Sequence, residues 1–217
     1  MANNLLMRVI NGIAGAGFTI WIVLGDWEFL VCLLVGLFLM LYEWTKINRG
    51  KKKYLLFYCG IIYIIIPTLF WALEYYNDNA YNGISYNLYT LWVLSIVWAC
   101  DIFAYFGGKL IGGPKLAPQI SPNKTWSGVV VGIIFSMMTS YIYVHNVLND
   151  NIKLFYLSIV IIISAILGDL LESKTKRILN VKDTGNIIPG HGGFCDRLDS
   201  FLLATYAFII IKLMGLL

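Results

Sequence analysis

Charged side chains are scarce in this sequence. Only 13% of its 217 residues are Asp, Glu, Lys or Arg, whereas 59% are hydrophobic. A soluble domain carries about 25% charged residues, so the composition excludes an ordinary soluble protein and indicates a chain that crosses a membrane several times. Linker-like and low-complexity stretches are also missing, so we expect a single domain over residues 1–217.

The sequence also lacks the cysteine spacings that are typical of disulfide frameworks and metal sites. The four cysteines, Cys32, Cys59, Cys100 and Cys195, are scattered, and three of them lie in apolar runs. Their spacing argues against a disulfide framework or a CxxC metal site, and it favours a role as small apolar packing residues. No small-residue cleavage site follows the first apolar run, so we do not expect a secretory signal peptide.

Long apolar runs, in contrast, fill the chain. A helix needs about 20 residues to cross the hydrocarbon core of a bilayer, and seven runs come close to that length. They cover approximately residues 5–25, 28–44, 54–73, 86–107, 127–145, 154–172 and 199–217. The period-two alternation that a membrane barrel requires is not evident. We therefore predict an all-α polytopic membrane protein with about seven transmembrane helices.

The loop charges predict the orientation of these spans. Lysines and arginines gather after the second, fourth and sixth spans, whereas the alternate loops are mostly acidic. By the positive-inside rule, the N-terminus and the basic loops are cytoplasmic and the C-terminus is outside. The segment 49–53, RGKKK, is most simply a topology anchor beside anionic headgroups, with direct substrate binding as the alternative. Trp27, Trp44, Trp71 and Trp126 lie near span ends, where aromatic belts are expected.

Polar residues gather at the predicted cytoplasmic ends of the spans, first at the end of the fourth. Asp101 and Tyr105 are four residues apart and therefore share a helix face, and Lys109 follows a Gly-Gly pair. The segment is not a phosphate-binding P-loop, because that motif requires Ser or Thr after the lysine and Leu110 stands there.

A second polar group precedes the fifth span. It reads Ser121-Pro122-Asn123-Lys124-Thr125-Trp126-Ser127-Gly128. The Pro-Asn pair favours a turn, and Thr125 or Ser127 can cap the helix that follows. A helix N-terminus with a lysine beside it is also a natural anion site. Helix capping alone and phosphate binding through Lys124 therefore both stay open.

The third polar group lies at residues 168–200, between the last two spans. Asp169, Glu172 or Ser173, and Lys176 recur at helical spacing, and Asp196 and Asp199 do the same at the start of the last span. Acids that face each other from neighbouring helices would suit Mg²⁺, and the bases between them would suit a polyphosphate. This combination points to phosphoryl or nucleotidyl transfer. The alternative is a set of salt bridges that fixes the helix ends.

His191 lies in a glycine-rich loop within this group, in the segment Pro189-Gly190-His191-Gly192-Gly193. The glycines would let the backbone approach a ligand closely. We interpret His191 as a loop-shaping or substrate-contacting residue, and proton transfer is the alternative. A phosphate monoester is already a nucleophile at neutral pH, so the predicted chemistry needs little help from a base.

Residues 173–199 resemble the signature of the phosphatidate cytidylyltransferases, also called CDP-diacylglycerol synthases. The matching positions are Ser173, Lys176-Arg177, Lys182-Asp183, Gly185, Ile188-Pro189, His191-Gly192-Gly193, Asp196-Arg197 and Asp199. The match is long and irregular, so chance is a poor explanation. Segments 101–109 and 121–126 are similar to shorter family motifs, in the expected order.

The resemblance implies that the chain transfers CMP from CTP to phosphatidate, with Mg²⁺ as cofactor, giving CDP-diacylglycerol and pyrophosphate for phospholipid synthesis. It implies Asp169 and Asp196 as metal ligands with Asp199 as a third acid, and it makes Lys176 and Arg177 catalytic phosphate contacts. The other candidate substrate contacts are Asp101, Lys109, Ser121, Asn123, Lys124, Ser173, Lys182, Asp183, His191 and Arg197. The implied partners are CTP, phosphatidate and membrane lipids, without nucleic acid, and a homodimer stays open.

Two other functions fit parts of the sequence. A CTP-using lipid enzyme, such as a polyprenol or phytol kinase or a synthase for archaeal ether lipids, would share the site but make another product. A transporter would carry acids in mid-span on several helices, whereas only Asp101 could lie that deep here. We expect a multi-pass protein of a bacterial inner membrane, with its active site facing the cytoplasm.

Overall fold

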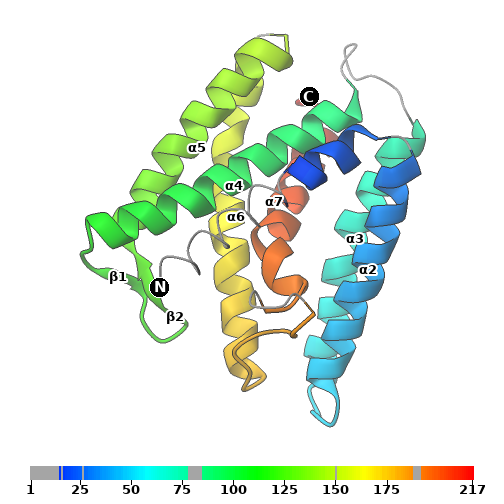
Figure 1. Cartoon of the computed structure of the whole chain (residues 1–217), viewed down its shortest axis with the longest axis vertical. Coiled ribbons are helices and arrows are strands. Elements are labelled where there is room, and N and C mark those ends of the chain that lie inside the picture. Colours follow the sequence, from blue (N-terminus) through cyan, green and yellow to red (C-terminus); the bar gives the residue numbers. More distant parts are fainter. Residues whose placement is uncertain (1–14, 16, 26, 78–84, 150, 188–191) are drawn as a thin grey trace.

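Long apolar helices dominate the structure (Figure 1). The computed structural model describes residues 15, 17–25, 27–77, 85–149, 151–187 and 192–217. Its helices are α2 (Trp27–Asn48), α3 (Tyr54–Asn77), α4 (Tyr86–Leu110), α5 (Trp126–Val147), α6 (Ile152–Ile178) and α7 (Cys195–Leu213). Helices satisfy all their backbone hydrogen bonds internally, which a lipid environment demands. Within the described ranges, the five helices α2 to α6 are long and apolar enough to cross a membrane.

The predicted spans agree with these helices, with two limits. Most of the predicted first span, 5–25, lies outside the described residues, although 17–24 are helical. The predicted last span, 199–217, corresponds to α7, whose first turn carries charged residues and which is not among the five apolar candidates. A polytopic helical membrane protein is therefore confirmed, whereas the count of seven spans stays a prediction.

Two helix ends differ from the predicted ones in a way that matters for the site. Helix α6 continues past residue 172 to Ile178, and α7 begins at Cys195 rather than at residue 199. The helices thus extend beyond their apolar parts into the charged segment. Lys176, Arg177 and Asp196 consequently stand on rigid helical turns and not in loops.

The helices pack in pairs, and glycines set the closest contacts (Figure 1). In the α6–α7 pair, a Cβ atom on Gly168 would lie 2.7 Å from the carbonyl oxygen of Asp199. In the α4–α5 pair, a Cβ atom on Gly128 would lie 2.6 Å from the carbonyl oxygen of Ala104. Such contacts leave no room for a side chain, so small residues let the helix backbones touch.

Two apolar clusters form the core. The larger one surrounds Trp71, Trp92 and Phe208, and the smaller one lies around Met40 and Trp44. The exposure of Trp27 and Trp126 is consistent with the predicted aromatic belts, whereas Trp44 and Trp71 are buried in the protein, so the prediction is wrong for these two. Both face neighbouring helices. The Trp71 indole N–H donates to Thr205 Oγ1 of α7 at 3.2 Å, and the Trp44 indole N–H donates to the Phe57 carbonyl of α3 at 2.9 Å.

A small β-hairpin interrupts the helical pattern between α4 and α5. Strand β1 (Lys115–Ala117) pairs antiparallel with β2 (Ser121–Thr125). The turn predicted at Pro122 and Asn123 is therefore wrong, since both residues lie within β2. The chain reverses earlier, where the Ile120 N–H donates to the Ala117 carbonyl at 3.1 Å. The pair of strands holds Lys124 beside Asp169 of α6.

Candidate active site

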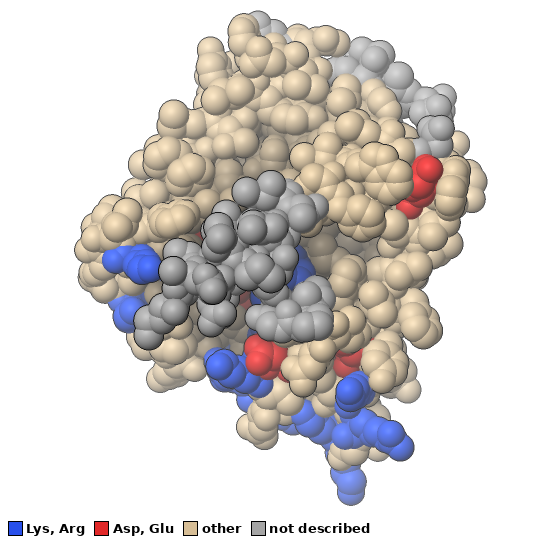
Figure 2. Space-filling view, viewed as in Figure 1, with Lys and Arg blue, Asp and Glu red and all other residues tan. Residues whose placement is uncertain are grey.

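The basic loops lie at one end of the helix bundle. On the face shown in Figure 2, most Lys and Arg side chains gather over the lower half, where α6 ends and α7 begins in Figure 1. Lys51 and Lys53, in the turn between α2 and α3, donate to the carbonyls of Leu179 and Ile178. Cations stabilise a helix C-terminus, so this turn is fixed to the end of α6.

The three polar groups of the sequence meet at this end. Lys124 of β2 forms an ion pair with Asp169 of α6. Arg177 Nε donates to the Ile120 carbonyl at 3.4 Å, and this joins α6 to the hairpin. The Ser200 hydroxyl of α7 donates to Asp101 Oδ1 of α4 at 3.5 Å. The expectation that the three groups share one side of the membrane protein is consistent with these contacts.

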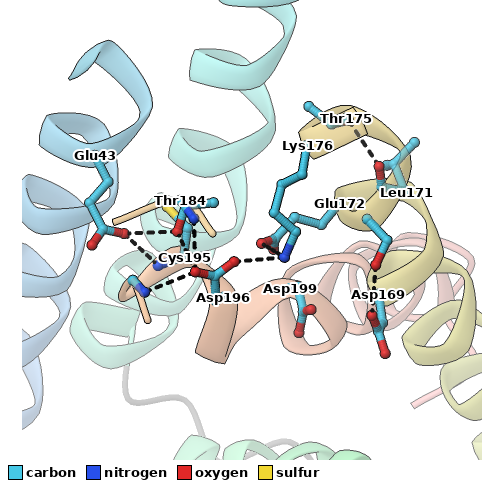
Figure 3. Close-up of polar contacts among 12 residues, drawn as sticks. Glu43, Asp169, Leu171, Glu172, Thr175, Lys176, Thr184, Cys195, Asp196 and Asp199 are labelled. Carbon is cyan, nitrogen blue, oxygen red and sulfur yellow. Dashed lines mark hydrogen bonds and ion pairs between the residues drawn. The ribbon is translucent and has the colours of Figure 1, made fainter. Parts of the chain in front are cut away.

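Three carboxylates approach one another where α4, α6 and α7 meet. The tight α6–α7 contact at Gly168 places Asp169 beside Asp199, and the charges of these two residues act on each other. Both charges also act on Asp101. Figure 3 shows the Asp169 and Asp199 side chains pointing to the same side of α6 and α7. Lys124 supplies the positive charge that offsets this acidic group.

Asp196 sits in a different environment, because its two oxygens have separate partners (Figure 3). Oδ1 accepts from Lys176 Nζ at 2.6 Å. Oδ2 accepts from the backbone N–H groups of Thr184 at 2.9 Å and Gly193 at 2.8 Å, and from the Thr184 hydroxyl at 3.0 Å. Burial raises the pKa of Asp196, but the Lys176 and backbone hydrogen bonds outweigh it and lower the pKa to about 2.

Lys176 links the two helices. Besides Asp196 of α7, its ammonium group contacts Glu172 Oε1 of α6 at 3.1 Å. One lysine thus bridges two acids, and a second lysine, Lys124, pairs with Asp169. The site alternates carboxylates and ammonium groups, which is the arrangement expected around a metal–polyphosphate ligand.

The remaining predicted residues lie at the rim of this site or elsewhere. Ser173 Oγ donates to Asp169 Oδ1 at 3.4 Å, and Ser121 is half-buried in β2. The Lys109 ammonium group stands over the Tyr105 ring, 5.7 Å from its centroid. The predicted residues with exposed side chains are Asp101, Lys109, Asn123, Arg177, Lys182, Asp183 and Arg197. His191 lies outside the described residues.

The cap expected before α5 is confirmed at Thr125. Its hydroxyl accepts the N–H of Gly128 at 3.1 Å. Thr125 therefore caps α5, whereas its neighbour Lys124 forms the ion pair with Asp169.

One acidic residue at the site was not predicted from the sequence. Glu43 of α2 is only 1% exposed, and it accepts hydrogen bonds from the N–H groups of Phe194 and Cys195, both at 2.9 Å. The available signal was an acid inside an apolar run, because ionisable residues in membrane segments usually have a function. Helix α2 therefore borders the site.

The donor set suits Mg²⁺, although no ready cage is present. Within the described ranges, no three His, Cys, Asp or Glu side chains converge closely enough to hold a metal by themselves. Mg²⁺ commonly uses only one or two carboxylates and takes its other ligands from water and substrate phosphates. Asp169 and Asp199, which lie near Lys124, and Asp196, which lies near Lys176, are candidate carboxylate ligands for such a site.

Comparison with known proteins places this chain in a family. The cytidylyltransferase family model matches residues 54–214. A phosphatidate cytidylyltransferase of Rickettsia bellii is 39% identical over 212 residues, covering 94% of this chain and 88% of the relative. One of Rickettsia prowazekii is 37% identical over 220 residues (97% and 92%), and one of Haemophilus influenzae is 41% identical over 168 residues (75% and 57%). The chain therefore belongs to the cytidylyltransferase family.

Proposed function

We propose that the site between α4, β2, α6 and α7 catalyses CTP-dependent synthesis of CDP-diacylglycerol from phosphatidate. The family match and the named relatives support this reaction, which makes the chain a nucleotidyltransferase of phospholipid synthesis. The observation that carries the assignment to this site is the alternation of Lys124–Asp169 and Lys176–Asp196 pairs at one end of the bundle.

The reaction requires charge neutralisation above all. A phosphate oxygen of phosphatidate attacks the α-phosphorus of CTP, and the bond from that phosphorus to the α–β bridging oxygen breaks. Pyrophosphate leaves with the electron pair. The attacking phosphate is already an anion at neutral pH, so the main barrier is repulsion between anions, which fixed cations reduce.

The lysines are placed for this task. Lys124 and Lys176 each hold a carboxylate in the structure, so both can exchange a carboxylate partner for a CTP phosphate. We assign phosphate contacts to them and to Arg177. Lys182, Asp183 and His191 lie in the sequence between α6 and α7, and Arg197 lies in the first turn of α7; all four keep their predicted role as substrate contacts. Ser121, Asn123, Ser173, Asp101 and Lys109, in the hairpin and on α6 and α4, keep the same predicted role.

Mg²⁺ is the proposed cofactor, held by Asp169, Asp199 and Asp196. When bound, it would neutralise the CTP phosphates and stabilise the charge that develops on pyrophosphate. The acids then have two tasks in the protein itself. They keep the lysine side chains oriented before substrate binds, and they compensate the lysine charges in a largely apolar environment.

The proposed topology rests on the basic residues that gather at this end of the bundle. We propose seven spans with a cytoplasmic N-terminus in a bacterial inner membrane, because the turn 49–53, the hairpin and the α6–α7 segment carry basic residues together. The active site then faces the cytoplasm, where CTP is present, and phosphatidate reaches it from the bilayer. A homodimer is a further prediction, which a mass measurement in detergent tests.

The decisive assay supplies purified protein in mixed micelles with phosphatidate, Mg²⁺ and CTP labelled in the cytosine ring. We expect label in the lipid phase, and its loss with a chelator or in Asp169→Asn. Asp169 is the preferred change because it has fewer contacts than Asp196, so the fold is less affected. Glu28→Gln, at the far end of α2, is the control variant.

A CTP-using lipid kinase is the second candidate, and the same assay separates it. A kinase would transfer label from γ-labelled CTP to a polyprenol and would leave the cytosine ring in the aqueous phase. Absence of cytosine label in the lipid, from folded protein, would refute the proposed reaction.

A further inference from the structure

The carboxylate of Glu43 is buried at the start of α7 although it belongs to α2. The residue precedes residues 54–214, the part of the chain that the family model matches. Oε1 accepts from the Phe194 N–H at 2.9 Å, and Oε2 accepts from the Cys195 N–H at 2.9 Å and lies 3.2 Å from the Thr184 hydroxyl oxygen. A buried carboxylate is costly without such donors, so its position is strongly determined.

Two glycines of the signature, Gly185 and Gly193, lie directly against this carboxylate. A Cβ atom on Gly185 would lie 2.3 Å from Glu43 Oε1, and one on Gly193 would lie 2.7 Å from Glu43 Oε2. Any side chain there would collide with the acid. The absence of a side chain at Gly185 therefore permits the contact with α2, and at Gly193 it permits the close approach of both Thr184 and Glu43.

The Thr184 hydroxyl connects Glu43 to the lysine network. It lies within hydrogen-bond distance of Glu43 Oε2 at 3.2 Å and of Asp196 Oδ2 at 3.0 Å. The other Asp196 oxygen binds Lys176 at 2.6 Å. Figure 3 shows this sequence of contacts from α2 through the Thr184 loop to α7 and α6.

Glu43 also takes the place of a helix cap. Phe194, the residue before α7, has no capping side chain of its own. A negative charge at the first N–H groups of a helix satisfies them and interacts favourably with the helix dipole. Glu43 thus fixes both the first turn of α7, which carries Asp196, and the loop that binds the second oxygen of Asp196.

We propose that Glu43 is a positioning residue for cytidylyl transfer. It holds the Thr184 loop and the α7 start so that Asp196 Oδ1 keeps Lys176 in place to contact the substrate phosphates. This inference rests on the proposed function. Its consequence is that α2 completes an active site whose signature residues all come from later in the chain.

The test compares Glu43→Gln with Glu74→Gln. Glu74 is also a buried glutamate, but it lies in the last turn of α3 and pairs with Lys212. We expect Glu43→Gln to lower kcat of the folded protein about 10- to 100-fold, since small displacements of reacting groups cost this much, with little change in KM for phosphatidate. Glu74→Gln should keep the wild-type kcat.

Thr184 provides the second variant pair in case Glu43→Gln does not fold. Thr184→Val removes the bridging hydroxyl and should lower kcat, whereas Thr184→Ser keeps the hydroxyl and should stay near wild type. The double variant Glu43→Gln with Thr184→Val should lose less kcat than the product of the two single losses, because both changes break the same series of contacts from Glu43 to Asp196. Unchanged kcat per folded molecule in Glu43→Gln or in Thr184→Val would overturn the proposal.

Thiol labelling separates this proposal from the proposed function. Cys195 is 7% exposed and its N–H binds Glu43, so Glu43→Gln should speed maleimide labelling of Cys195, read by peptide mass spectrometry. Glu74→Gln should not. Wild-type protein that makes no CDP-diacylglycerol would refute the proposed function, whereas equal Cys195 labelling in wild type and Glu43→Gln would refute the contact itself.

Discussion

The Lys124–Asp169 ion pair gives the sharpest test of the site. Replacing Lys124 by Met removes one ammonium group and keeps most of the side-chain volume. The two side chains are 26% and 27% exposed, and a partly exposed ion pair contributes about 1 kcal/mol or less to stability. For a chain of this size, that corresponds to a change of about 2–4 °C in Tm.

The expected loss of activity is much larger than the loss of stability. Removing one preorganised charge or donor from a transition state costs about 100- to 1,000-fold in rate, or roughly 2.7–4 kcal/mol. We therefore expect Lys124→Met to lower kcat/KM for CTP by at least about 100-fold while Tm changes little. Lys124→Arg, which keeps the charge, should recover part of the activity.

The assay measures initial rates of CDP-diacylglycerol formation over a range of CTP concentrations, with Tm followed on the same preparations. Lys115→Met, in the neighbouring strand of the hairpin, is the matched control and should retain activity. A Lys124→Met enzyme within threefold of wild type in kcat/KM for CTP would refute the assigned role.

Three further changes test how the site is supported. Gly168→Ala places a methyl group 2.7 Å from the Asp199 carbonyl oxygen, so α6 and α7 must separate. We expect the free energy of unfolding to fall by about 1–3 kcal/mol, measured by thermal melting, and turnover to lose most of its rate. Thr125→Ala removes the cap of α5 and should cost about 1 kcal/mol, with thermal melting as the readout and an unchanged Tm as the contrary result. Lys51→Ala combined with Lys53→Ala frees the end of α6 and should increase hydrogen exchange there; identical exchange would contradict the contacts.

The helices were the most predictable part of the fold. Apolar runs of about 20 residues have few alternatives in a bilayer, so α2 to α6 could be located from composition alone. Their ends were less predictable. The apolar run stops before Lys176, but the helix continues, because α7 packs against α6 through Gly168 and supplies ionic partners for the charged turns.

The hairpin and the buried tryptophans show a second limit of sequence reasoning. Ser121–Thr125 contains turn-forming residues, yet its pairing with Lys115–Ala117 makes it a strand. Trp71 near a span end has the same local sequence signal whether it faces headgroups or a neighbouring helix. Only the positions of the other helices decide between these outcomes.

The sequence by itself determined the membrane class, the signature between residues 173 and 199, and the grouping of acids and bases at one end of the spans. These features depend on local composition and spacing, which a single chain segment carries. The tertiary structure decided which lysine faces which acid and that Glu43 joins them, since Glu43 and Cys195 touch across 152 positions of the chain. Such contacts follow from the rotation and crossing of packed helices, and these depend on all the helices together.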